Sequence, residues 1–207
     1  NTSWAIIPDD CLKPSNLNAG CGDWVFAIKV GKVAACSSAD SSNWDIFAKA
    51  WDSQDSTGEL YTRDREVLWY GEILTSAQAE FGSVTPGTGF EDNVNEVNSI
   101  SVTYIANGDY DQKVKSSPSW NGHGKVATFD ASGNCNNPQE FSLKAFKEDT
   151  FSKAVQVDTI GVSIDATGTR TEEDGNTVAT NTLWLKVSSV FSSDTYSGTI
   201  TYIIAER

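Results

Sequence analysis

Acidic side chains on predicted strands come closer to a catalytic arrangement than any other residues of this sequence. Glu72 lies in the segment Leu68-Trp-Tyr-Gly-Glu72-Ile, where strand alternation places it on one face with Tyr70 and Leu68. Two carboxyl groups about 5–10 Å apart can hydrolyse a glycosidic bond. Asp45 or Glu140 could supply the second carboxyl group, and nothing in the sequence selects either of them.

The surroundings of these acids argue against an enzyme. The chain has neither the catalytic-strand motifs nor the spacing of the small secreted xylanases and cellulases. Acids on the solvent-facing side of a strand are usually hydrated and need no special role. We therefore predict that the protein is not an enzyme. A small β-sandwich glycoside hydrolase that uses Glu72 is kept as an alternative.

Few residues of the sequence could support histidine-dependent catalysis or metal binding. The chain has 1 histidine, His123, between two glycines in a predicted turn. A Ser-His-Asp triad would have to use it, but no strand-to-helix elbow carries an exposed serine. The acidic turns 107–111 and 172–176 do not follow the twelve-residue calcium-loop pattern. We predict no metal and no cofactor.

Tryptophan side chains are the candidates for sugar binding, because aromatic rings stack on sugar faces. Trp184 stands out, since in Leu183-Trp-Leu185 it points away from the face that the leucines occupy. Such a residue marks a binding surface, a subunit contact or a second buried layer. A secreted glycan-binding adhesin is therefore a second alternative. The pool of candidates is Trp44, Trp51, Trp69, Trp120 and Trp184.

The 4 cysteines predict disulfide bonds in an exported protein. The sequence starts at Asn1 without methionine, which favours a processed terminus from which a signal peptide has been removed. We expect Cys11 to pair with Cys21 and Cys36 to pair with Cys135, although four cysteines allow three pairings. We therefore predict an extracellular or cell-surface location.

Composition limits the class of partner. The net charge is −13, and the 15 lysines and arginines do not cluster, which disfavours nucleic acid and anionic lipid as partners. No apolar run approaches the roughly 20 residues that span a bilayer. Hydrophobic residues make up 39% of the 207 residues, enough for one domain with its own core.

Period-two alternation predicts an all-β fold. The pattern is cleanest in Ile100–Tyr104, Phe141–Ala145 and Leu183–Val187, where one face is apolar and the other mostly polar. A short helix is predicted at Ser76–Phe81. The expected strands are Trp24–Val30, Asp45–Trp51, Val67–Leu74, Ser99–Ile105, Tyr110–Ser116, Lys125–Phe129, Glu140–Phe146, Ala154–Ile164, Thr182–Ser188 and Ser197–Ile204.

We predict one domain, 1–207, built as an antiparallel β-sandwich of the Ig-like or jelly-roll type. Residues 66–207 read as a continuous series of strands and form its core. Residues 1–65 hold three of the four cysteines and have poorly periodic loops, such as Cys36–Asn43 and Asp52–Gly58. We expect them to form a disulfide-bearing elaboration packed on that core.

The C-terminal segment Thr195-Tyr-Ser-Gly-Thr-Ile-Thr-Tyr-Ile-Ile204 resembles the closing strand of surface-exposed β-sandwich proteins, including pilin-like and cell-wall-associated domains. Phe81–Phe90, followed by Ser99–Tyr104, is similar to the opening of such a domain. The resemblance covers mainly residues 66–207. It implies a filament in which an extended segment of one subunit completes the sheet of its neighbour.

Physical reasoning supports self-association through strand edges. Edge strands carry unpaired N–H and C=O groups that can pair with another chain. The apolar segment Asn1-Thr-Ser-Trp-Ala-Ile-Ile7 could pair within its own sheet or reach a neighbour's edge. We predict a structural subunit of an extracellular filament or pilus, with Trp4, Ile6, Ile7 and Trp184 as candidate subunit contacts.

Overall fold

The computed structural model describes residues 4–7, 27–40, 44–50, 58–171 and 176–207, and this part of the chain is all-β. This confirms the predicted all-β class. Its helical structure consists of one four-residue helix, α1 (Ser37–Asp40), and one 3₁₀ turn, η3 (Phe151–Lys153). Within the described ranges, no helix has the length and apolar character needed to cross a bilayer.

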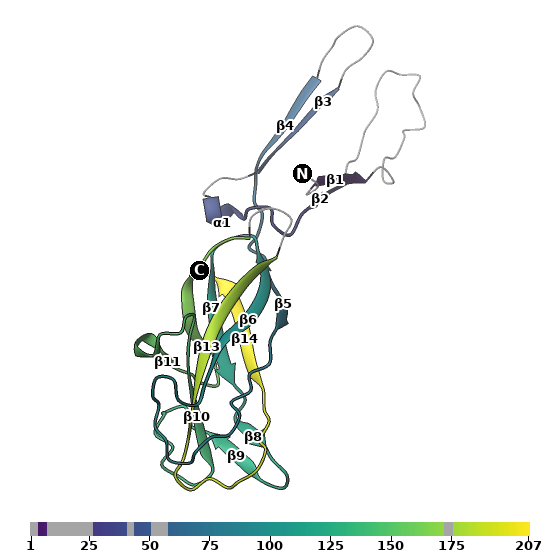
Figure 1. Cartoon of the computed structure of the whole chain (residues 1–207). Coiled ribbons are helices and arrows are strands. Elements are labelled where there is room, and N and C mark those ends of the chain that lie inside the picture. The colour runs from purple at the N-terminus through teal and green to yellow at the C-terminus, as the bar shows by residue number, and fades with distance from the viewer. Residues whose placement is uncertain (1–3, 8–26, 41–43, 51–57, 172–175) are drawn as a thin grey trace.

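Residues 71–206, called the body below, contain two sheets (Figure 1). All strand pairs are antiparallel except β9 with β10, which is parallel. The seven-stranded sheet contains β5 (Gly71–Ser76), β6 (Glu96–Ala106), β13 (Thr177–Val187), β10 (Glu140–Phe146), β9 (Val126–Phe129) and β8 (Ser119–Asn121), with β11 (Val155–Gln156) beside β10. The three-stranded sheet contains β12 (Val162–Gly168), β7 (Tyr110–Ser116) and β14 (Ile200–Glu206).

The two sheets share one hydrophobic core. Alternate residues of β7 are buried along its whole length, as strand geometry requires of a half-covered sheet. Phe141 and Leu143 of β10 and Leu183 of β13 are 0% exposed. Val114 and Ile164, from the three-stranded sheet, belong to the same cluster. The body is therefore held together by packing between sheets as well as by strand pairing.

Two ribbons precede the body, and Figure 1 shows them extending from one end of it. In the first ribbon, β1 (Trp4–Ile7) pairs with β2 (Ala27–Val30). In the second, β3 (Trp44–Ala50) pairs with β4 (Gly58–Arg65). Each of these sheets has only two strands, with no third strand beside either pair in the described ranges.

Hydrogen bonds attach the base of the β3–β4 ribbon to α1 and to the body. The backbone N–H of Ser37 donates to Val67 O at 3.0 Å, and Val67 N–H donates to Ser37 Oγ at 3.2 Å. Tyr70 N–H donates to Asn107 Oδ1 at 2.6 Å, and Asn107 N–H donates back to Tyr70 O. The residues between β4 and β5 are therefore held by hydrogen bonds to α1 and to the body.

The predicted strands match the structure best in the centre of the body. Tyr110–Ser116 and Glu140–Phe146 have the predicted bounds. The predicted strand Ala154–Ile164 is wrong as one element, since it divides into β11 and β12. β4 and β8 were not predicted, and the helix α1 falls in a predicted loop.

The predicted helix Ser76–Phe81 is also wrong. Ser76 ends β5, and Ala77 N–H donates to Ser101 O at 2.9 Å, which continues the pairing with β6 for one more residue. Residues 77–81 then have no regular structure. Bonding to a neighbouring strand has replaced the local helical bonds that the sequence pattern suggested.

The predicted Cys36–Cys135 disulfide is absent, because both thiols are free and buried. Cys36 N–H donates to Asn107 O, next to the Tyr104–Thr177 end of the β6–β13 pair. Cys135 Sγ lies 3.8 Å from Lys186 O, at the other end of β13. Nine strand residues separate these ends by roughly 30 Å, whereas a disulfide needs Cα atoms within about 7 Å. Cys11 and Cys21 lie outside the described residues.

Candidate functional site

A cleft of about 1030 Å³ lies in the body, lined by Trp120 of β8 and by two irregular segments. β8 is at the end of the body away from the ribbons (Figure 1). Beneath it lie Phe141, Leu183 and Leu185, which belong to the hydrophobic core and are at most 4% exposed. One wall is the segment 76–86, and the other is the segment 191–202. The volume lies at the upper end of the roughly 300–1,000 Å³ typical of binding pockets, so the cleft exceeds what one side chain would fill.

Trp120 connects the cleft to the core. Its ring lies 4.2 Å from the ring of Phe141 and 6.3 Å from that of Phe81, measured between centroids. Trp120 Nε1 is buried and has no hydrogen-bond partner in the part of the chain that the structure describes. An unpaired buried donor costs about 1–3 kcal/mol. Gly198 covers this side of the ring, since a Cβ on Gly198 would lie 2.4 Å from Trp120 Nε1.

Polar contacts hold the second wall of the cleft in place. Gln139 Nε2 donates to Tyr196 Oη at 2.8 Å, and Tyr196 Oη lies 3.2 Å from Ser192 O. His123 Nδ1 and Asp194 Oδ1 are 3.0 Å apart. The hydrogen bond from His123 lowers the pKa of Asp194, which keeps this carboxylate charged at the rim of the cleft.

The cleft opens along a seam where two edge strands lie side by side without pairing. β14 pairs with β7 only, and β5 pairs with β6 only, among the strands described. At one end of the seam the two strands touch, since Ile204 Cδ1 would lie 3.0 Å from a Cβ placed on Gly71. At the other end, Ser76 and Ile200 both line the cleft.

The edge of β14 presents backbone donors to this seam. Ser117 N–H donates to Thr199 O at 2.8 Å, whereas Ser116 N–H donates away from β14, to Asp158 O at 3.0 Å. Antiparallel pairs alternate between these two arrangements, and Ile200 is the partner of Ser116. The N–H groups of Ile200 and Tyr202 therefore point away from β7, toward the seam.

A second unusual surface lies on the β3–β4 ribbon. Phe47 and Tyr61 are cross-strand partners whose ring centroids are 4.7 Å apart. They are 49% and 52% exposed, and Ile46, on the opposite face of the ribbon, is 43% exposed. Adjacent large apolar side chains that stay exposed in this way often mark an interaction site.

Glu72, the candidate catalytic acid, is part of an ion pair. It accepts hydrogen bonds from Lys32 Nζ at 2.5 Å and from Tyr70 Oη at 2.6 Å. The bond from Lys32 lowers the pKa of Glu72, and the bond from Tyr70 adds to this effect. A general acid needs a raised pKa, so these contacts suit a structural role at the junction of ribbon and body.

The two candidates for a second acid have other partners. Asp45 accepts a hydrogen bond from Asp64 N–H at 3.2 Å, within the β3–β4 ribbon. Glu140 accepts two bonds from Asn137, at 2.8 and 2.7 Å, beyond the far end of the seven-stranded sheet. The structure gives neither carboxylate a contact with Glu72.

The tryptophan candidates within the described ranges do not form an exposed platform. Trp184 is 0% exposed; its Nε1 donates to Glu96 Oε2 at 2.9 Å, and its ring packs against Phe151 at 5.6 Å. It belongs to a second buried layer, which was one of the three roles that the sequence left open. Its role as a subunit contact stays a prediction. Trp44 and Trp69 donate to the carbonyl oxygens of Ala35 and Asp109. Trp51 lies outside the described residues.

The other candidate contacts lie at the start of the chain. Trp4, Ile6 and Ile7 belong to β1, whose backbone pairs with β2 of the same chain. This is the pairing within the chain that the sequence left open as one of two choices. Their role as subunit contacts stays a prediction.

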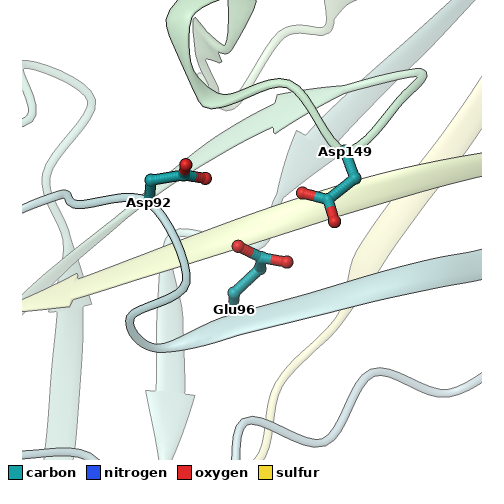
Figure 2. Close-up of side chains that lie close together, drawn as sticks. All are labelled: Asp92, Glu96 and Asp149. Carbon is teal, nitrogen blue, oxygen red and sulfur yellow. The ribbon is translucent and has the colours of Figure 1, made fainter.

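Three acidic side chains converge on the outer side of the seven-stranded sheet, where sequence reasoning had marked no site. Figure 2 shows Asp92 before β6, Glu96 at its start and Asp149 after β10, with carboxylate oxygens within 4.8 Å of one another. Carboxylate oxygens are ligands for Ca²⁺, which takes six to eight. Glu96 Oε2 already accepts hydrogen bonds from Trp184 Nε1 and from Asn93 N–H. The cluster alone assigns no function.

The cleft itself was also missed by sequence reasoning, because its walls are irregular segments distant in the chain. The available signal was indirect. Strand alternation stops between residues 77 and 95 and again between 188 and 199, and both gaps contain aromatic residues such as Phe81 and Phe191. Comparison with protein-family models, curated proteins and solved structures found no match to this chain.

Proposed function

We propose that this protein is a structural subunit of an extracellular filament or pilus and assembles through the edges of its β-strands. In this proposal the body is a β-sandwich of the Ig-like or jelly-roll type whose two sheets remain unjoined along one side. The observation that carries it is the unpaired seam between β14 and β5, which widens into a cleft that contains Phe81, Trp120 and Phe191.

An unpaired edge next to a cleft with aromatic side chains favours capture of another chain. Backbone N–H groups at the edge supply main-chain hydrogen bonds, and the cleft supplies pockets for side chains. Because the cleft and the ribbons lie at opposite ends of the molecule (Figure 1), contact between unlike ends of successive copies would not close on itself. Contacts of that kind produce open filaments.

Electron microscopy of the native surface material tests the proposal directly. We expect long polymers that bind an antibody against this chain at the cell surface. Purified protein that stays monomeric at high concentration, with no labelled polymer on cells, would contradict it.

A substitution at the seam tests the role of the strand edge. Ile200→Pro removes one backbone donor that points toward the seam, and proline is tolerated at strand edges because that N–H has no partner in its own sheet. Ile200→Ala is the matched control, since it removes most of the same side chain but keeps the donor. We expect Ile200→Pro to reduce polymer yield well below that of Ile200→Ala.

The folded state of both variants is checked first by thermal unfolding. If both are folded and polymerise to the same extent, assembly through the β14 edge is wrong. Polymerisation is measured by sedimentation and by counting filaments in negative stain.

A further inference from the structure

The β3–β4 ribbon lacks the packing between sheets that stabilises the body. An isolated two-stranded ribbon is marginally stable at best in water, and it normally needs a third strand or a packed face. This ribbon has neither in the described ranges, and Phe47 and Tyr61 on one face are about half exposed. A surface that packs against this face would remove both aromatic rings from water and support the strands.

The exposed face carries a positive charge. The guanidinium carbon of Arg63 lies 5.5 Å from the centroid of the Tyr61 ring, so the charge sits over the aromatic pair. No ion pair involves Arg63 among the described residues. A partner surface that matches this face is therefore apolar in the centre and acidic at the edge.

The cleft of the body has these properties. Phe81, Trp120 and Phe191 are among its lining aromatic side chains. The charged residues among its described lining are Glu80 and Asp194, and both are acids.

The ribbon cannot reach the cleft of its own chain. Five residues, 66–70, connect β4 to β5, and when fully extended they span at most about 18 Å. They are also tied to Ser37 and Asn107 by the hydrogen bonds at the base of the ribbon. Figure 1 shows the ribbon and the β8–β9 end of the body, where the cleft lies, on opposite sides of the molecule.

We infer that the β3–β4 ribbon of one copy packs its Phe47–Tyr61 face into the cleft of a second copy. This inference rests on the proposed function and names the two surfaces in contact. Arg63 then approaches Glu80 and Asp194 at the rim. Each copy uses one ribbon and one cleft, so the contact repeats along the filament.

Photo-crosslinking locates the contact. Phe47 is replaced by the aromatic crosslinker p-benzoylphenylalanine, and filaments are irradiated and digested for mass spectrometry. We expect crosslinks between chains to peptides from 76–86 or 191–202. Val126 on β9, which is 53% exposed, is the control position and should not give the same crosslinks to 76–86 and 191–202. Filaments in which position 47 crosslinks only to other surfaces would overturn the inference.

A pair of matched variants measures the strength of the contact. Phe47→Ser removes the aromatic ring from the ribbon, and Val126→Ser removes a similarly exposed apolar side chain from the body. Burial of an aromatic ring corresponds to about a tenfold or larger change in affinity. We expect Phe47→Ser to raise the concentration needed for polymerisation by about tenfold or more, and Val126→Ser to leave it unchanged.

The outcomes separate this inference from the proposed function. If the wild-type protein forms no polymer, the proposed function fails, and the inference fails with it. If wild-type filaments form and Phe47→Ser behaves like Val126→Ser, only the inference is wrong. Unchanged thermal unfolding of the body in both variants shows that the comparison is between folded proteins.

Discussion

Strands β10 and β3 both mix apolar and polar residues but have very different surroundings. β10 is Glu-Phe-Ser-Leu-Lys-Ala-Phe and β3 is Trp-Asp-Ile-Phe-Ala-Lys-Ala, so both are strand-forming mixtures of apolar and polar residues. Phe141 of β10 is 0% exposed, whereas Phe47 of β3 is 49% exposed. β10 has strand neighbours on both sides and a second sheet over its apolar face, whereas β3 has one neighbour. The side chains of a strand are therefore buried only when another layer covers the strand. Pairing with a neighbouring strand is not enough.

This difference assigns the two regions different sources of stability. In the body, burial of core side chains contributes roughly 1.5–3 kcal/mol for each large apolar residue. In the β3–β4 ribbon, half of that aromatic surface remains in water. The ribbon thus retains apolar area that only a further surface can bury, and the body has already buried most of its own.

The largest expected effect on the free energy of unfolding comes from removing an aromatic ring of the body. The same change in the ribbon is the comparison. Phe141→Ala deletes a side chain that packs 4.2 Å from Trp120 and 5.3 Å from Phe129. We expect it to lower the free energy of unfolding by about 3–5 kcal/mol, because the buried ring is lost and a cavity is left. Phe47→Ala should change it by less than about 1 kcal/mol in the monomer.

Urea unfolding of the monomer, followed by tryptophan fluorescence, measures both values. Equal losses in the two variants would contradict the comparison, because the ribbon would then be part of the same cooperative core.

The sequence predicts much of the body because its strands follow simple alternation. Tyr110–Ser116 and Glu140–Phe146 each have one covered face. A strand of this kind can be predicted from the alternation of apolar and polar residues alone. It fails at Ala154–Ile164, which contains β11 and the start of β12, two strands that belong to different sheets. A run of residues does not specify which sheet each part will pair with.

The candidate site was less accessible to sequence reasoning, because long-range contacts create it. The outward Trp184 was correctly placed opposite the leucines, but the loop carrying Phe151 covers it. The Cys36–Cys135 pair was wrong because spacing along the chain says little about distance across a sheet. The hydrogen bond from Lys32 to Glu72 joins residues that are forty positions apart, so the sequence could not predict it.

A smaller effect is expected where a loop of the body packs as tightly as its strands. A Cβ on Gly198 would lie 1.8 Å from Trp120 Cδ1, in the wall of the cleft. Gly198→Ala should therefore lower the free energy of unfolding by about 1–3 kcal/mol, because the tryptophan ring must shift. Gly89→Ala is the matched control, since its nearest atom is 3.9 Å away.

Thermal and urea unfolding compare these two variants with the wild type. A Gly198→Ala protein as stable as Gly89→Ala would show that the Trp120 side of the cleft is loosely packed. The contrast between a packed body and an uncovered ribbon would then be weaker than proposed.

The smallest expected effect is electrostatic and concerns Asp165 of β12. Burial raises the pKa of Asp165, but hydrogen bonds from Thr167 and from Lys147 outweigh it, so the pKa in the folded protein lies below its ordinary value. Lys147 Nζ is 3.1 Å from Asp165 Oδ1, and Thr167 N–H donates to the same oxygen at 2.8 Å. A lowered folded pKa stabilises the protein fully above the unfolded pKa of about 3.9, and this contribution is lost as the pH falls through the folded value.

Asp165→Asn should therefore cost stability at pH 7, by less than about 1 kcal/mol for such a partly exposed pair. The gap to the wild type should close as the pH falls below about 4, because the protonated acid is then as neutral as asparagine. Urea midpoints at pH 7, 5, 4 and 3 measure this gap. Asp45→Asn, which removes the same charge from the ribbon, controls for net charge. A gap that stays constant across this range would mean that the charge of Asp165 contributes nothing, and that packing alone distinguishes the body from the ribbon.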